Sequence, residues 1–296
     1  MKFTPGYTAL FNNHNLINCR GRLLDLSVPK IMGILNVTPD SFFDGGKFTE
    51  QKAIIKQAAK MLDEGADIID IGANSTRPGA KMANAATELK RLLPAIASLR
   101  ENFPDAILSV DTFRAGIAEK CVDQGVSIIN DVSGGDLDKK MFQTIARLNV
   151  PYILMHMQGT PDTMQENPEY SNVVLEVTAN LAKKVSLLKQ LGVHDIIIDP
   201  GFGFGKSAEH NYEILNALPA LSYIGRPILA GVSRKSMICK VLKVNPEKAL
   251  NGTTALHMVA LINGATLLRV HDVKEAVQTV KLYEMMKRND PFGIVQ

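Results

Sequence analysis

The sequence contains few cysteines and little net charge. Only three of its 296 residues are cysteines (Cys19, Cys121 and Cys239), and their odd number and wide spacing favour neither a disulfide framework nor a zinc site. The formal net charge of +3 is too small to predict a nucleic-acid partner, which requires a concentrated basic face. Small anionic substrates are compatible with this composition.

A long hydrophobic run is also missing. No apolar segment approaches the roughly 18 residues that a membrane-spanning helix needs. The opening MKFTPGYTAL has neither the basic start nor the apolar core of a signal peptide. We therefore expect a soluble, cytoplasmic protein with no membrane partner.

Several common catalytic motifs are absent. The six histidines form no H-E-x-x-H pair and no G-x-S-x-G elbow occurs, which argues against a zinc protease and a serine hydrolase. The segment GFGFGKS (Gly201–Ser207) is not a Walker A loop, because Pro200 stands where the first glycine is required. We interpret it as a tight loop that brings Phe202 or Phe204 to a flat ligand, with plain loop packing as the alternative.

Short β-branched runs recur along the chain, and amphipathic stretches such as Gln51–Leu62 separate them. Most runs are continuously hydrophobic, which is typical of parallel strands covered on both faces. Eight alternations predict an α/β fold, a (β/α)8 TIM barrel that forms one domain over residues 1–296, with an open doubly wound sheet as the main alternative. The segment Cys19–Ser27 suits a short N-terminal β-hairpin closing the barrel bottom. The expected strands are Ile31–Leu35, Ile68–Ile71, Ile107–Val110, Val126–Ile129, Tyr152–Met155, Ile196–Ile198, Ile228–Val232 and Thr266–Val270.

Polar side chains follow nearly every expected strand. A single acid at a strand end is as readily a turn or helix cap as a functional group. So many of them are harder to explain by capping, because the carboxyl ends of barrel strands build the active site of this fold. The residues in question are Asn36, Ser75–Arg77, Asp111, Asn130, Asp131, Asp199, Ser233–Ser236, Arg269 and His271.

These side chains divide into two chemical sets. Asp111, Asn130 and Asp199 offer hydrogen-bond acceptors and an amide, which suit a flat heterocycle with a guanidine-like edge. A cationic set suits phosphate oxygens or a carboxylate, and the neutral oxygen of Asn36 suits a Mg²⁺ ion that also holds a diphosphate. That cationic set comprises Arg77, Lys235, Arg269 and His271.

Two helix starts are expected near this set. Asp272 stands three residues before Glu275, the spacing of a helix cap. Ser233 precedes the segment RKSMICKVL, which suits a short helix whose N-terminus attracts an anion, with a simple serine cap as the alternative reading.

Several long motifs follow one another along the chain. They are GILNVTPDSF (Gly33–Phe42), STRPGA (Ser75–Ala80), SVDTFRA (Ser109–Ala115), IINDVSG (Ile128–Gly134), LMHMQGTP (Leu154–Pro161), DPGFGFGK (Asp199–Lys206), SRKS (Ser233–Ser236) and RVHDV (Arg269–Val273). In this order they resemble the dihydropteroate synthase family, a family of pterin-binding enzymes, and the resemblance extends from about Arg20 to Val273.

The resemblance implies a homodimeric barrel that condenses 6-hydroxymethyl-7,8-dihydropterin diphosphate with p-aminobenzoate in the presence of Mg²⁺. It implies a pterin site at Asp111, Asn130, Met155, Asp199 and Lys235. The diphosphate and the metal would lie at Asn36, Arg269 and His271. Of these residues, Asp111, Lys235, Arg269 and His271 are the expected catalytic group. The implied p-aminobenzoate pocket consists of Asp40, Phe42, Thr76, Arg77, Pro78, Phe204, Lys235 and Ser236.

The chain departs from the family pattern at three places. Phe43 replaces a more usual serine, Asn74 replaces a more usual glutamate, and Asn251–Thr254 is a variant segment. The first two flank the p-aminobenzoate loops, so they bear on loop packing and on sulfonamide affinity. The competing functions are a pterin-binding methyltransferase domain, which needs no diphosphate set, and a non-catalytic pterin-binding paralogue. The presence of Arg77, Lys235 and His271 together argues against both.

Overall fold

The structure, a computed structural model, describes residues 15–38, 47–74, 82–159 and 168–291. Its strands are β1 (Leu16–Cys19), β2 (Arg22–Asp25), β3 (Lys30–Asn36), β4 (Ile68–Gly72), β5 (Ile107–Asp111), β6 (Ile128–Asp131), β7 (Tyr152–Met155), β8 (Ile196–Asp199), β9 (Leu229–Ala230) and β10 (Leu267–Val270). Its α-helices are α1 (Lys47–Asp63), α2 (Ala85–Asn102), α3 (Ala115–Asp123), α4 (Met141–Leu148), α5 (Val173–Gln190), α6 (Ala208–Asn216), α7 (Leu218–Leu221), α8 (Ser236–Leu242), α9 (Leu250–Ile262) and α10 (Val273–Arg288).

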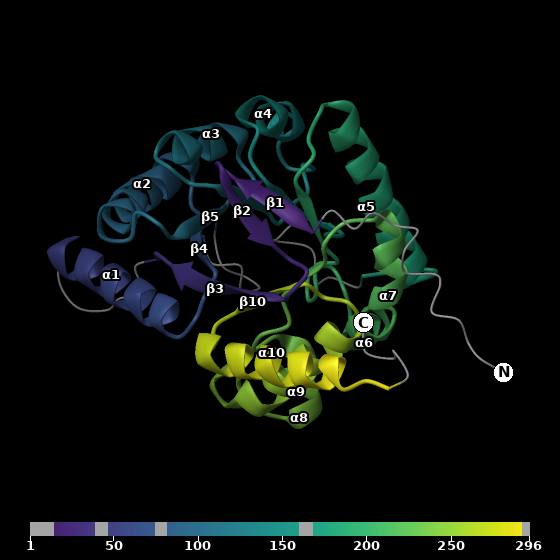
Figure 1. The fold of residues 1–296 in the computed structure, drawn as a ribbon. Helices are drawn as coiled ribbons and strands as arrows, with labels where there is room; N and C mark the ends of the chain where they lie inside the picture. The colour runs from purple at the N-terminus through teal and green to yellow at the C-terminus, as the bar shows by residue number, and fades with distance from the viewer. Residues whose placement is uncertain (1–14, 39–46, 75–81, 160–167, 292–296) are drawn as a thin grey trace.

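The strands β3 to β10 form one parallel sheet of eight strands in the order β8-β7-β6-β5-β4-β3-β10-β9. A parallel bridge between Ile198 and Ile228, at the two ends of this order, closes the sheet on itself. The amide of Ile198 donates to the carbonyl of Pro227 at 2.9 Å in the same seam. The predicted TIM barrel is therefore confirmed and the open doubly wound sheet is excluded; the helices surround the barrel (Figure 1).

A hairpin made of β1 and β2 lies across one end of the barrel (Figure 1). Its two-residue loop, Arg20 and Gly21, has positive φ at both positions, as hairpin turns of the I′ type require. Inward side chains of the hairpin and of every barrel strand form one buried apolar layer, so the predicted N-terminal hairpin is confirmed as the cover of the barrel bottom. The layer consists of Ile17, Cys19, Leu24, Leu26, Met32, Ile68, Ile107, Ile128, Ile153, Ile197, Leu229 and Leu267.

Successive side chains along each barrel strand point alternately to the barrel interior and to the surrounding helices. In β5, Leu108 and Val110 join the outer core beneath the helices, while Ile107 faces the interior. The helix α5 shows the matching pattern, since Val177, Leu181 and Leu188 are buried at helical spacing against the sheet. Each fully buried Leu or Ile side chain contributes about 1.5–3 kcal/mol, so this shell is the main source of stability.

Most predicted strands differ from the observed ones by at most one residue at an end, and two differ by more. The fourth begins at Ile128 instead of Val126, because the amide of Val126 closes the end of α3 by donating to the carbonyl of Cys121. The seventh ends at Ala230, since the carbonyl of Val232 already accepts from Lys235 in the following turn. In the part of the chain that the structure describes, no helix is both long and apolar enough to cross a membrane.

Candidate active site

Four neighbouring strands end at one level of the barrel mouth. In the sheet register Asn36 pairs with Gly72, Gly72 with Asp111, and Asp111 with Asn130. These residues have the same parity as the interior Met32, Ile68, Ile107 and Ile128, so their side chains face inward above the apolar layer. The strand ends thus convert a hydrophobic interior into a polar mouth, as the sequence predicts.

The centre of the mouth is a carboxylate–guanidinium network. Arg269 donates from Nε to Asp70 at 2.7 Å and from Nη2 to Asp111 at 2.9 Å. The amide nitrogen of Asn130 donates to the same Asp70 oxygen at 3.0 Å. Asp70 is fully buried, and its second oxygen has no hydrogen-bond partner among the described residues. The network therefore orders two sequence-predicted residues, Arg269 and Asn130, around an acid that the sequence reasoning missed.

The charged side chains of this network are largely buried, and burial changes their pKa values. Burial raises the pKa of the Asp111 carboxyl to about 7, although Arg269 opposes the shift. Burial disfavours the Arg269 cation, but Asp70 and Asp111 outweigh it and raise the pKa of the guanidinium. Arg269 is consequently a fixed positive charge, while Asp111 is a carboxyl whose charge depends on pH.

Lys235 and Asp199 form a second charged group beside the first. The Lys235 ammonium donates to the carbonyl of Phe202 and lies 4.7 Å from the centroid of the Phe204 ring. Burial lowers the pKa of Lys235 to about 8, and Asp199 opposes that shift. Burial likewise raises the pKa of Asp199, which Lys235 counteracts, and an Asp199 oxygen accepts from the Gly201 amide at 2.7 Å.

A small apolar cluster adjoins Lys235. It contains Val132, Met155, Met157 and Phe204, which are 2–8% exposed and form a cluster separate from the rest of the core. An aromatic ring and two thioethers offer a flat, polarisable surface for a planar ligand. The expected contribution of Phe204 and Met155 to a ring-binding surface fits this arrangement.

The loops after β9 and β10 are joined at the rim. The His271 amide donates to the Ser233 hydroxyl at 3.2 Å, and Arg234 donates two bonds to Asp272 at 2.8 and 2.6 Å. Both expected helices form: α10 begins directly after its N-cap Asp272, and the short helix α8 begins at Ser236 with Lys235 at its N-cap. Neither N-cap makes a side-chain cap bond, and the alternative reading of Ser233 as the cap of α8 is wrong. Ser233 and Asp272 instead form hydrogen bonds that join the two loops.

The chain is similar to known proteins over most of its length. A family described as pterin binding enzyme matches residues 32–271. A dihydropteroate synthase of Escherichia coli K12 is 41% identical over 267 residues, which cover 90% of this chain and 94% of that protein. The chain belongs to the dihydropteroate synthase family. It is accordingly a transferase of the pterin-binding barrel class.

Solved structures of dihydropteroate synthases agree with the fold. A Xanthomonas albilineans dihydropteroate synthase with 4-aminobenzoic acid aligns with a TM-score of 0.86 and 39% identity, covering 92% of this chain and 98% of that one. A structure of the Xanthomonas albilineans enzyme in complex with 7,8-dihydropteroate aligns at a TM-score of 0.82 and 37% identity, with the same coverage.

Some of the site residues that the sequence predicts lie outside the part of the chain that the structure describes. Near them, the Asn74 side chain accepts from the Ala83 amide at 2.9 Å, so this departure from the family pattern ties together the two ends of segment 75–82. The predictions outside the described residues concern Asp40, Phe42, Phe43, Thr76, Arg77 and Pro78.

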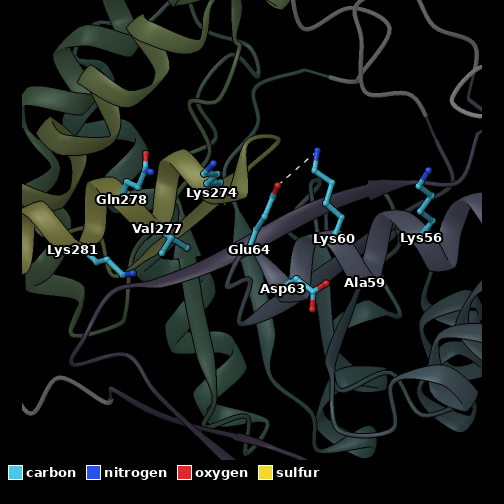
Figure 2. A pocket seen from close by; sticks show the side chains of 9 residues that line it. All are labelled: Lys56, Ala59, Lys60, Asp63, Glu64, Lys274, Val277, Gln278 and Lys281. Carbon is cyan, nitrogen blue, oxygen red and sulfur yellow. Dashed lines mark ion pairs between the residues drawn. The ribbon is translucent and has the colours of Figure 1, made fainter.

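A groove of about 720 Å³ also lies on the outer wall of the barrel, between α1 and α10 (Figure 2). Lys56, Lys60, Lys274 and Lys281 line it, and Lys60 pairs with Glu64 at 3.8 Å. None of the mouth residues lines this groove, so it is separate from the candidate active site.

Proposed function

We propose that the chain joins 6-hydroxymethyl-7,8-dihydropterin diphosphate to p-aminobenzoate, releasing pyrophosphate and 7,8-dihydropteroate. The observation that carries this proposal is the barrel mouth, where buried acceptors lie next to the Arg269 guanidinium, the Lys235 ammonium and a flat apolar surface. Each half of the reaction has matching groups there. The acceptors suit a pterin edge, and the cations suit a departing diphosphate.

The pterin ring would lie against Asp111, Asn130, Asp199 and Lys235, with Met155 beside its face. Asp111 and Asp199 are 8% and 6% exposed, and each has one oxygen bonded within the protein, to Arg269 and to the Gly201 amide. A ligand that donates no N–H groups would leave their other, buried oxygens without a partner. That penalty favours a pterin over a flat ring without an amino edge.

The diphosphate would meet Arg269, His271 and Asn36. Burial and the neighbouring Arg269 lower the pKa of His271 to about 4, so His271 would be a neutral hydrogen-bond donor and not the cation that the sequence predicted. Mg²⁺ fits this position as a partner of the substrate, since Mg²⁺ is usually held by one or two protein oxygens together with phosphates and waters. Asn36 supplies a neutral oxygen at the rim, and the described residues contain no cluster of three or more His, Cys, Asp or Glu that could form a protein-only cage. When bound, Mg²⁺ would neutralise charge on the leaving group.

The p-aminobenzoate would occupy the side of the mouth formed by Phe204, Lys235 and Ser236. Ser236 is exposed at the first position of α8, where it can bond a carboxylate. Asp40, Phe42, Thr76, Arg77 and Pro78 complete this pocket in the proposal.

The reaction requires positioning and charge stabilisation more than a base. The bond between the pterin methylene carbon and the diphosphate oxygen breaks, and its electron pair leaves with the oxygen toward Arg269 and His271. The neutral aniline nitrogen then forms the new carbon–nitrogen bond and releases its proton to water. Preorganised charges lower such a barrier without reorganising during the step.

Two further properties belong to the proposal. We infer that the protein works in the cytoplasm, which agrees with its few cysteines, and that it acts as a homodimer. Its partners would be small molecules only, with no nucleic acid and no membrane.

Pyrophosphate release by the purified protein tests the function directly, with each substrate and Mg²⁺ omitted in turn. We expect release only when all three are present, together with dihydropteroate. Pterin binding without release would instead identify a non-catalytic paralogue. A rate that followed the titration of a basic side chain would contradict the base-free course.

A further inference from the structure

Lys206 is a buried lysine that the proposed reaction does not use. Burial lowers its pKa to about 7, while Asp199 and the four acceptor atoms around the nitrogen favour the protonated form. Lys206 follows β8 and is 3% exposed. Its ammonium contacts Nδ1 of His156 at 3.0 Å and the carbonyl of His156 at 3.3 Å. It also donates to the carbonyls of Gly201 at 3.0 Å and Phe204 at 2.9 Å. No carboxylate lies within ion-pair distance of it among the described residues.

Such a site is unusual because buried lysines are normally paired with an acid. Here three backbone carbonyls and a ring nitrogen surround the ammonium, as oxygen ligands surround a metal ion. The ring nitrogen must accept, since the ammonium has only donors. Burial and the nearby Lys206 charge lower the pKa of His156 to about 3, which keeps the ring neutral and able to accept.

The surrounding backbone explains why a cation is needed. A Cβ atom at Gly201 would overlap the carbonyl oxygen of His156, and one at Gly205 would overlap that of Gln158. The loops after β7 and β8 therefore pack backbone against backbone. Their carbonyl dipoles converge on one point, and without a positive charge there they would repel one another.

The turn that Lys206 holds also carries contacts to the proposed pterin site. Between Gly201 and Phe204, the carbonyl of Phe202 accepts from Lys235 and the ring of Phe204 lies beneath its ammonium. The amide of Gly201 donates to Asp199. A shift of this turn would move both Lys235 and Asp199.

We propose that Lys206 is a positioning residue, a built-in cation that draws the carbonyls of the 201–204 turn and of His156 together and thereby places Lys235 and Asp199. It does not touch the substrate. The proposal rests on the proposed function for its kinetic consequence, whereas its effect on pterin binding is measurable independently of turnover.

The test is Lys206→Ala in the full chain, assayed with and without n-propylammonium, which replaces the deleted side chain with a free cation. We expect kcat/KM for the pterin diphosphate to fall about 100-fold, the cost of a misplacement of about 1 Å. Propylammonium should restore at least a tenth of the wild-type value, and propanol, of similar shape without charge, should restore none.

Lys184→Ala is the matched control. Lys184 is another buried lysine, 8% exposed, but it pairs with Asp136 at 2.7 Å. We expect its loss to lower the melting temperature without changing KM, and without any response to propylammonium. Lys206→Met, which keeps most of the stem, serves if the alanine variant does not fold.

The proposal is overturned if folded Lys206→Ala or Lys206→Met keeps wild-type kinetics and pterin affinity, or if propanol rescues as well as propylammonium. Calorimetric titration of the pterin diphosphate separates this failure from that of the function. If the wild type binds the pterin but forms no dihydropteroate, the proposed function fails, while weaker and propylammonium-rescued pterin binding by Lys206→Ala still supports the role of Lys206.

Discussion

At the scale of single residues, Asp111 carries the clearest pH dependence. Its pKa is raised by burial to about 7, so lowering the pH through that value protonates it and removes one acceptor for the pterin edge. We expect kcat/KM for the pterin diphosphate to fall as the pH drops below about 7. Asp111→Asn should lower kcat/KM about 10- to 100-fold, from the loss of a charged hydrogen bond, and make it flat over this range.

Steady-state rates between pH 5 and 9, for the wild type and Asp111→Asn, check this prediction. The same carboxyl binds its proton more tightly in the folded chain than in the unfolded one. Its contribution to stability is therefore present at low pH and is lost as the pH rises toward about 7. An unchanged acid limb in the variant would assign the titration to another group, with Asp199 the next candidate.

Asp70 is the residue that the sequence reasoning missed. It lies within the run Ile68–Gly72, where an acid among apolar residues passes for part of a buried strand. The available signal was the position in the strand. Asp70 is two residues from Ile68 and two from Gly72, so its side chain points to the same face of the sheet, the barrel interior. What the sequence could not give is the contact to Arg269, which is 199 residues away along the chain.

Asp70→Asn should reduce both stability and activity. It removes the charge that pairs with Arg269 at 2.7 Å in a fully buried position, and breaking such a pair costs about 3 kcal/mol or more. Urea unfolding measures the stability loss, and kcat/KM measures the displacement of Arg269. Glu119→Gln is the control, because its partner Arg147 is 60% exposed and solvent-exposed ion pairs contribute little to stability. Equal losses in both variants would contradict a special role for Asp70.

At the scale of elements, hydrophobic runs predicted the strands well, whereas polar termini predicted where helices α8 and α10 begin but not what the polar side chains bind. A parallel strand buried on both faces has few sequence alternatives, so seven predicted strands overlap the observed ones within one or two residues at each end, and the seventh strand of the barrel is shorter. A polar residue before a helix has many possible partners. Asp272 binds Arg234 and Ser233 binds His271, both from another loop, so local spacing alone could not reveal either contact.

The hairpin of β1 and β2 lies outside the barrel, and we expect its buried side chains to stabilise the fold. Ile17 is fully buried against the barrel interior, whereas Leu16 on the same strand is 56% exposed. We expect Ile17→Ala to lower the free energy of unfolding by about 2–5 kcal/mol, and Leu16→Ala to change it by about 0.5 kcal/mol or less. Denaturant titration measures both values. KM should stay unchanged in either variant because the hairpin covers the end opposite the mouth; a raised KM for Ile17→Ala would show that the two ends are coupled.

At the scale of the whole molecule, the fold was predictable because it follows from a repeated local pattern, while the site required long-range pairing. The residues of the central network, Asp70, Asp111, Asn130 and Arg269, come from four strands of the barrel. Their positions at strand ends predicted a common mouth. Their hydrogen-bond partners depend on the shear of the closed barrel, which hydrophobic pattern does not encode.

The proposed homodimer is a property of the whole molecule. On the outer face of α10, which lies on the rim of helices in Figure 1, Leu282 and Met285 are 63% and 60% exposed. In a two-fold dimer the same patch is used by both copies, so one substitution introduces two charges into one interface. We therefore expect the wild type to have twice the chain mass by light scattering and Leu282→Glu to have the mass of one chain. Leu175→Glu, at a residue 66% exposed on α5, should remain dimeric. A dimer that survives Leu282→Glu would place the interface on another face, and a monomeric wild type would refute the homodimer.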